Sequence, residues 1–236
     1  MDDELNIKKK KLNIWLKLVI GAAALLVIFA LLRIFGVLQW YNMDGRSNMP
    51  NLKHGDQFLA SNLITPERFD FITFKTDYFG WEEVWVSRFC AFEGEAVSFK
   101  DGTFFMNGQI LDSHLDLQYR YRCEASFGHV LAEKLGLEFY LDYYPMVRPE
   151  YNLDSVDLFL TSEQVIDRPL LKRRILSEPN DTIAAYWGEP LWNENYFGPI
   201  TVPKDHCFVL GDNRDNSSDS RYIGFIHLDD VYGVLF

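Results

Sequence analysis

An unbroken apolar segment near the N-terminus constrains this chain more than any other feature. Residues 18–32 contain no charged side chain, and the longer stretch 12–41 contains only Lys17 and Arg33. About 20 apolar residues in a helix cross the roughly 30 Å hydrocarbon core of a bilayer. The two cationic side chains lie near the ends of the stretch, where they can extend to the interface. The sequence therefore predicts a transmembrane anchor at residues 12–41.

The orientation of this anchor follows from the basic cluster before it. Residues 8–11 are all lysine, and positive charge favours the cytoplasmic side of a membrane. We therefore expect residues 1–11 to be a cytoplasmic tail and residues 42–236 to be extracytoplasmic. The chain would be a single-pass protein of the cell (inner) membrane, in contact with the lipid bilayer. A cleaved signal peptide is the alternative, but the apolar run is long for one and no small-x-small cleavage site follows it directly.

Charge and cysteine content limit what the remainder can bind. Residues 47–236 carry 16 Lys and Arg against 30 Asp and Glu. Nucleic acid needs a basic face, so this acidic part argues against a nucleic-acid partner. The spacing of Cys90, Cys123 and Cys207 matches no zinc pattern and requires no disulfide. We expect three buried thiols and no cofactor.

Beyond the anchor, short apolar and aromatic runs alternate with turns, which is typical of β structure. Asp101-Gly102 and Asn107-Gly108 flank one such run and favour tight hairpin turns. Helical spacing is best at residues 128–137. We therefore predict a mainly β domain with an insertion at about residues 110–165. The predicted strands are 71–74, 84–86, 96–99, 103–106 and 207–210.

A turn-rich segment follows the anchor directly. It reads GRSNMPNL at residues 45–52, with Gly55-Asp56 just beyond. Ser47 lies three residues before a proline, where a fixed loop can hold its hydroxyl exposed. A serine in an ordinary turn is the commoner explanation of this pattern taken by itself.

The densest polar segment lies near the C-terminus. It reads GDNRDNSSDSRYIG at residues 211–224, between two apolar runs. A calcium loop is one interpretation, because Asp212, Asn216 and Asp219 carry oxygen ligands. The spacing does not match an EF-hand, however, and Arg214 and Arg221 would repel a cation. Ion pairing that involves Asp219 and Arg221 is the better interpretation.

A third segment, LKRRILSEPND at residues 171–181, places three basic residues within an apolar strand. A solvated edge strand explains this pattern in most proteins.

Together these three segments resemble type I signal peptidases, also called leader peptidases. The family's membrane-proximal motif reads roughly Ser-Met-x-Pro-Thr-Leu and then Gly-Asp, which matches SNMPNL at 47–52 and Gly55-Asp56. The family's last motif matches residues 211–224 almost without change. The resemblance covers the anchor, residues 43–109 and residues 199–236. It implies a signal-peptidase-like β-sheet domain with one N-terminal transmembrane helix.

The resemblance also implies a serine–lysine dyad with Ser47 as nucleophile. A neutral lysine takes the proton of the hydroxyl, which requires burial to lower the lysine pKa. The family's oxyanion hole uses the nucleophile's own N–H and often a hydroxyl two residues earlier, a position that Gly45 fills here. Ser217 matches the serine that positions the lysine. Asp219 and Arg221 match the structural ion-pairing positions.

The general base is where the chain departs from the family. By order, Ser87-Arg88 occupy the family's Lys-Arg position, and serine cannot replace the lysine. A faint internal repeat, residues 66–108 and 149–195, offers a second alignment. Without a gap it gives Arg173, which stays protonated. If one extra residue is allowed as a β-bulge, this alignment places Lys172 at the lysine position. A bulge changes the direction in which the neighbouring side chains point. We expect Lys172 to be the base, with no competent lysine as the alternative.

The function implied by the resemblance is a serine endopeptidase that removes signal peptides from exported preproteins at the outer membrane face. Its substrates would carry small residues at the −1 and −3 positions. Preprotein signal peptides are the expected partners, and the secretion machinery is a further candidate. Two alternatives stay open: a specialised peptidase for one substrate such as a pilin, and a catalytically impaired relative that binds secreted segments.

Overall fold

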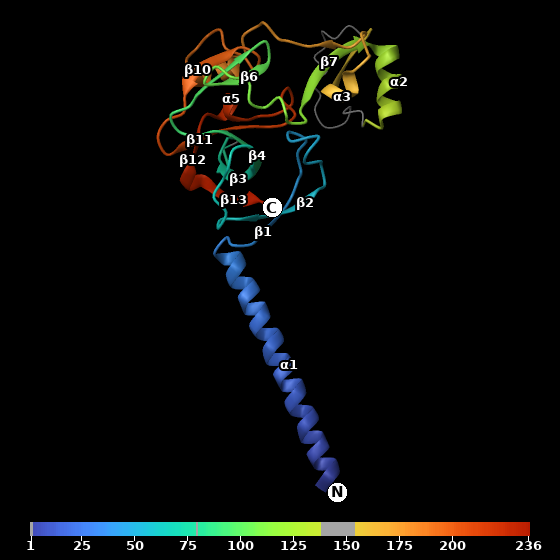
Figure 1. Ribbon diagram of the computed structural model, residues 1–236, viewed down its shortest axis with the longest axis vertical. Coiled ribbons are helices and arrows are strands. Elements are labelled where there is room, and N and C mark those ends of the chain that lie inside the picture. Colours follow the sequence, from blue (N-terminus) through green and yellow to red (C-terminus); the bar gives the residue numbers. More distant parts are fainter. Residues whose placement is uncertain (1, 79, 138–153) are drawn as a thin grey trace.

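A single long helix leads into a β-rich domain at its C-terminal end (Figure 1). The computed structural model describes residues 2–78, 80–137 and 154–236. The helix is α1 (Asp2–Ile34), and its segment Asn13–Ile34 has a mean hydropathy of 2.5 with no part buried against the rest of the protein. In length and composition α1 can cross a membrane, a test that a signal sequence near an N-terminus also meets.

The helix ends before the predicted anchor does. Gly36 adopts φ +71°, a left-handed conformation that ends a helix and that glycine tolerates best. Residues predicted as the end of the anchor form strand β1 (Gln39–Asn42) instead. Trp40 therefore lies on a strand next to α1, with 55% of its surface exposed.

The largest sheet has seven strands in an antiparallel arrangement. Apolar residues on its strands, such as Ile72, Phe74, Phe89 and Val209, form one buried cluster. The strands, in spatial order, are β1, β2 (Gln57–Ser61), β13 (Val231–Leu235), β3 (Phe71–Thr76), β4 (Glu83–Ala91), β11 (His206–Leu210) and β12 (Ile226–His227). Short helices flank β12: α5 (Ser220–Ile223) before it and the 3-10 turn η1 (Leu228–Asp230) after it.

A second antiparallel sheet carries the predicted hairpins. It joins β10 (Phe197–Thr201), β5 (Ala96–Lys100) and β6 (Thr103–Met106). Asp101 and Gly102 both have positive φ, at 50° and 67°, as the tight turn between β5 and β6 requires. This sheet, helix α4 (Asp181–Trp187) and one side of β11 share a second buried cluster. All five predicted strands are therefore confirmed.

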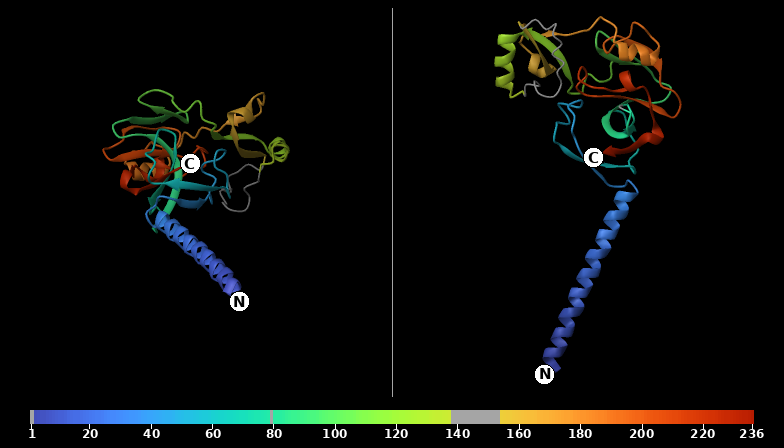
Figure 2. Two further views of the ribbon diagram at one scale, coloured as in Figure 1. Left: turned by 60° about the horizontal axis from the view of Figure 1, so that its bottom comes forward. Right: turned by 180° about the vertical axis from the view of Figure 1, so that it is seen from behind.

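A smaller three-stranded sheet stands apart from these, with α2 packed on one of its faces (Figures 1 and 2). Its strands are β8 (Ser155–Thr161), β7 (Gln118–Glu124) and β9 (Lys172–Arg173), in that order, joined by α2 (Ala125–Leu135) and α3 (Ser162–Val165). The helix expected at 128–137 is thus present. The predicted insertion at 110–165 supplies most of this unit, which continues to Arg173; residues 138–153 lie outside the described residues.

The predicted internal repeat is wrong. Residues 66–108 build β3 to β6, whereas the described part of residues 149–195 builds β8, α3, β9 and α4. In the second segment a helix replaces the expected hairpin. Asn180 caps this helix, α4, by accepting hydrogen bonds from the N–H groups of Thr182 and Ile183. Similar spacing of a few residues did not encode the same unit.

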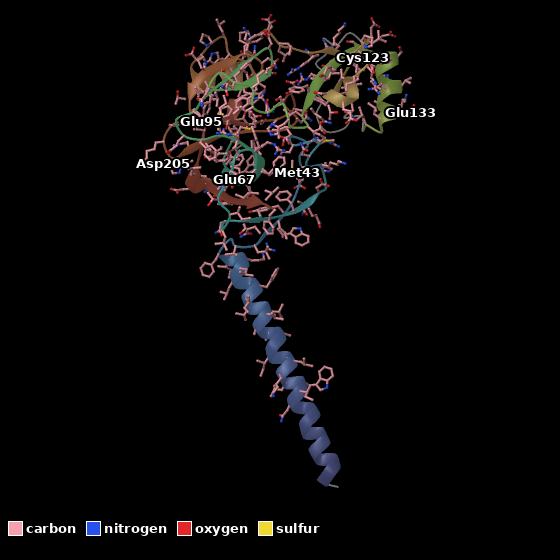
Figure 3. All side chains as sticks on the ribbon, in the orientation of Figure 1. Met43, Glu67, Glu95, Cys123, Glu133 and Asp205 are labelled. Carbon is pink, nitrogen blue, oxygen red and sulfur yellow. The ribbon has the colours of Figure 1, made fainter. Side chains whose placement is uncertain are left out.

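The three cysteines are free and buried, as predicted. Cys123 lies on β7 of the small unit, which also contains the α2 residue Glu133 (Figure 3). Burial raises the pKa of the Cys90 and Cys207 thiols to about 12, so both stay protonated. They act as small apolar side chains of the core.

Candidate active site

Ser47 lies in the loop between β1 and β2, and two other elements hold that loop. The Ser47 carbonyl accepts a hydrogen bond from Asn213 N at 2.8 Å. Asn213 Nδ2 also donates to Arg46 O at 3.3 Å. On the other side, Asn48 Nδ2 donates to Val86 O on β4 at 2.7 Å. The serine is thus fixed between β4 and the polar segment 211–224, and it is only partly buried.

Asp212 joins the same three elements through its carboxylate, which is fully buried. Arg88 of β4 binds it with two hydrogen bonds, Nε–Oδ1 at 2.7 Å and Nη2–Oδ2 at 2.5 Å. Asn51 of the Ser47 loop donates to Oδ2 at 2.7 Å. The sequence suggested Asp212 only as an oxygen ligand of the calcium-loop interpretation and Asn51 only as a residue of the matched motif, and neither as a support of Ser47. The polar character of the motifs was visible, but which polar residues pair was not.

Ser87 occupies the β4 position next to Arg88 and is 2% exposed. The β4 segment 86–88 lies next to the Ser47 loop, because Val86 O accepts a hydrogen bond from Asn48 and Arg88 binds Asp212. The structure therefore brings residues 45–52, 86–88 and 211–217 together.

Asp219 and Arg221 form the predicted ion pair. Both side chains are buried, and Arg221 donates from Nε and Nη2 to the two carboxylate oxygens at 2.8 Å each. Burial lowers the pKa of the Arg221 guanidinium, but the charge and hydrogen bonding of Asp219, with smaller contributions from Tyr222 and Asp215, together raise the pKa above its usual value. The carboxylates of Asp212 and Asp219 both bind arginine side chains. The two carboxylates that the calcium-loop interpretation needs are therefore already paired.

Ser217 lies against the Ser47 loop. A Cβ atom on Gly211 would stand 2.2 Å from Ser217 Oγ and 2.5 Å from Ser47 O. Position 211 must therefore be glycine if these two groups are to lie this close. Ser217 Oγ is buried and has no hydrogen-bond partner among the described residues.

The structure does not bring Lys172 to Ser47. Lys172 is exposed on β9, opposite Arg122 of β7. Gln118, at the other end of β7, is the residue paired with Asn213 beside Ser47. Four residues of strand separate these two pairings, which is about 13 Å at 3.3 Å per residue.

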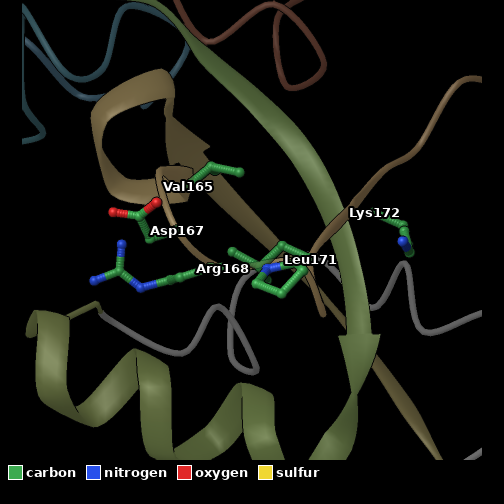
Figure 4. A pocket seen from close by; sticks show the side chains of 6 residues that line it. Val165, Asp167, Arg168, Leu171 and Lys172 are labelled. Carbon is green, nitrogen blue, oxygen red and sulfur yellow. The ribbon is translucent and has the colours of Figure 1, made fainter.

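Lys172 instead lines a hollow of the small unit with Val165, Asp167, Arg168, Pro169 and Leu171 (Figure 4). Its role as general base has no support from this placement and stays a prediction. The alternative Arg173 donates to Gly102 O at 2.8 Å and lies over the Tyr119 ring, contacts of a structural residue.

Gly45 lies close to the nucleophile. A Cβ atom there would be 3.8 Å from Ser47 Oγ and 3.5 Å from Met43 Cε, which are ordinary contacts. A Cβ atom at position 45 therefore fits without displacement, within 4 Å of Ser47 Oγ.

We expect Gly45→Ser to raise the cleavage rate of a peptidase that acts through Ser47, by about 10-fold. Loss of one oxyanion donor costs about 10²–10³-fold in other enzymes, and an added donor with imperfect geometry recovers part of that. Gly45→Ala is the matched control, since it adds the Cβ without the hydroxyl. Equal rates for the two variants would show that the position contributes no oxyanion donor.

A family model and curated relatives match this chain along most of its length. The family model described as "Signal peptidase, peptidase S26" matches residues 13–236. Signal peptidase I of Bacillus caldolyticus is 25% identical over 210 residues, covering 87% of this chain and 81% of that protein. Signal peptidase I of Buchnera aphidicola subsp. Baizongia pistaciae is 24% identical over 247 residues, covering 94% and 76%.

Two further comparisons are more local or more distant. A signal peptidase I P of Bacillus subtilis subsp. natto is 59% identical over 39 residues, which are 16% of this chain and 21% of that protein. The crystal structure of a signal peptidase I from Enterococcus faecalis V583 covers 73% of this chain and 98% of its own, at 24% identity and a TM-score of 0.35. Because the family model spans the chain from the apolar helix to the last residue, this protein belongs to the signal peptidase family, peptidase S26.

Proposed function

We propose that this protein is a membrane-anchored serine endopeptidase that removes signal peptides from exported preproteins, with Ser47 as its nucleophile. Family membership supports the reaction class. The observation that carries the assignment of Ser47 is the 2.8 Å hydrogen bond from Asn213 N to Ser47 O, which fixes the loop against the last motif. A fixed loop holds the hydroxyl in one place for attack.

The reaction would be acyl transfer. Ser47 Oγ would attack the scissile carbonyl carbon, and the backbone N–H of Ser47 would stabilise the oxyanion. Ser217, Asp219 and Arg221 would support the loop rather than touch the substrate. The test is cleavage of a purified preprotein by the full chain in lipid vesicles, with the new N-terminus identified by mass spectrometry.

The anchor would place the site at the membrane surface. We infer that α1 crosses the cell membrane with its basic N-terminal end in the cytoplasm, because residues 8–11 are lysine. The β-rich domain would then face the exported part of a preprotein whose signal peptide lies in the same bilayer. Reaction of an introduced cysteine at Ser218 with a membrane-impermeant thiol reagent in whole cells tests this orientation.

One observation favours the alternative of a catalytically impaired relative that binds secreted segments. β4 carries Ser87, not lysine, next to Arg88, whose side chain binds Asp212 beside the Ser47 loop. A serine hydroxyl cannot accept the nucleophile's proton at neutral pH, so the described contacts supply no strong base from β4.

Ser87→Lys is expected to raise Ser47-dependent cleavage by about 10²-fold, because a positioned general base contributes about 10²–10⁴-fold. Burial at this position would lower the lysine pKa and keep part of it neutral. Ser87→Met is the matched control, of similar length without the amine. Initial rates for the two variants in vesicles measure the effect. A rate increase in both would show that the gain comes from side-chain volume and not from a base.

A further inference from the structure

The small unit is attached to the last motif through the first residues of β7. Gln118, where β7 begins, donates from its N–H to Asp212 O at 3.0 Å and accepts from Arg214 N at 2.9 Å. Two residues further along the strand, Arg120 N donates to Asp215 Oδ2 at 2.8 Å. The beginning of β7 therefore lies alongside the last motif, which also holds the Ser47 loop.

Asn51 makes a separate contact, between the Ser47 loop and the residues that lead into β7. Its Nδ2 donates to Asp116 O and to Asp212 Oδ2, at 2.7 Å each. The partners fix the orientation of the amide, because exchanging its nitrogen and oxygen would place Oδ1 against two acceptors. A single nitrogen atom thus joins the loop both to the last motif and to the insertion.

The position of Asn51 in its loop lets this contact act on the nucleophile. Asn51 N donates to Asn48 O at 3.0 Å, which closes a turn directly after Ser47. Asn48 is held by Val86 O on β4. One end of the turn is therefore fixed by β4, and the other end is fixed by Asn51 and its two acceptors. A displacement of about 1 Å at a reacting group can cost about 10²-fold in rate, so both ends bear on Ser47.

The amide at position 51 does what a hydroxyl could not. An amide NH₂ group donates two hydrogen bonds, whereas a hydroxyl donates one. The motif that this loop matches has threonine at the position of Asn51, and threonine could serve only one of the two acceptors. Asparagine serves both, and so adds a bond to the insertion at Asp116.

We propose that Asn51 is a positioning residue for Ser47, and that it acts by tying the nucleophile loop to the insertion at Asp116. The inference rests on the proposed function. Asn51 touches neither the substrate nor the reacting atoms in this account. It fixes the place from which Ser47 Oγ approaches the scissile carbonyl carbon. The insertion then belongs to the support of the active site and is more than an appended unit.

Asn51→Ala should lower the kcat of preprotein cleavage by about 10-fold and leave KM within about 2-fold, because the shift displaces Ser47 and not the bound signal peptide. Initial rates of the full chain in lipid vesicles, against preprotein concentration, measure both constants. The matched control is Asn62→Ala. Asn62 is also exposed, and its Nδ2 donates to Phe35 O at 2.7 Å, outside the site. This control should keep both constants.

Asn51→Asp separates the hydrogen-bond donor from the shape of the side chain. The ionised carboxylate has nearly the same shape as the amide but donates no hydrogen bond to Asp116 O or Asp212. It should lower kcat at least as much as Asn51→Ala does. A kcat retained in Asn51→Asp and lost in Asn51→Ala would mean that position 51 acts through side-chain volume, and would overturn the proposal.

A double-variant cycle tests the part played by the insertion. Asp215→Ala removes the acceptor of Arg120 N and so releases β7 from the last motif at a different contact. Once β7 and Asp116 have shifted, Asn51 has lost its partner there. The double variant with Asn51→Ala should therefore lose less kcat than the product of the two single losses. A loss equal to that product would assign the effect of Asn51 to Asp212 alone and overturn the role of the insertion.

The remaining outcomes separate this inference from the proposed function. If Asn51→Ala and Asn51→Asp both keep the full kcat while Ser47→Ala is inactive, the positioning role is wrong and the proposed function stands. If only Ser87→Lys shows Ser47-dependent cleavage, the Asn51 variants are compared in that background with the same expected losses. Absence of Ser47-dependent cleavage in both backgrounds would contradict the proposed function and the inference together.

Discussion

Ser47→Ala is expected to lower preprotein cleavage by at least about 10³-fold, since removal of a catalytic nucleophile leaves only the rate supplied by binding and oxyanion stabilisation. The substitution removes one oxygen atom, and no hydrogen bond that holds the loop passes through it. The Ser47 contact with Asn213 uses the backbone carbonyl, which alanine keeps. Initial rates of the full chain in lipid vesicles, with the product identified by its new N-terminus, measure the effect.

The matched control is Ser218→Ala, an exposed serine in the last motif. It should cleave at the rate of the unsubstituted protein. Both variants should unfold at the same temperature as the unsubstituted protein, because neither hydroxyl makes a buried hydrogen bond among the described residues. Cleavage retained in Ser47→Ala would assign the nucleophile to another residue, whatever the behaviour of Ser218→Ala.

Asp219→Ala is expected to destabilise the protein by about 3–5 kcal/mol, because it leaves the Arg221 guanidinium buried without its counter-charge. Arg221 is 1% exposed, and its remaining bonds go to the backbone oxygens of Glu194 and Arg214. Asp219 also accepts from Gly211 N at 3.1 Å, so its loss loosens the turn beside Ser47. Urea unfolding of the full chain in detergent, followed by tryptophan fluorescence, measures the change.

The double variant Asp219→Ala with Arg221→Met separates charge burial from other losses. Replacing both partners of a buried pair by apolar groups removes the unpaired charge, so the double variant should be more stable than Asp219→Ala alone. Glu82→Gln, which breaks the exposed pair with Lys75, should leave the unfolding midpoint unchanged. A double variant no more stable than Asp219→Ala would mean that the carboxylate matters through its other bonds and not as a counter-charge.

The elements that depend on local pattern could be predicted from the sequence. The apolar helix follows from length and composition, and the hairpin at Asp101-Gly102 follows from residues that tolerate positive φ. The five apolar runs became strands because each was bounded by turn residues and had a buried face. The repeat failed because it compared spacings, and a single capping residue, Asn180, sufficed to start a helix in one copy.

The sequence by itself determined the chemistry available: a serine after an apolar anchor, a polar last motif, and no lysine at the position next to Arg88. Only the tertiary structure decided which of these groups meet. Asp212 joins residues far apart in the chain, because its buried carboxylate needs both Arg88 and Asn51. Lys172 was placed by spacing alone, but the strand register pairs it with Arg122, at the end of β7 away from Asn213. The register between strands far apart in the chain depends on which whole strand faces are buried. The spacing of a few residues does not determine that register.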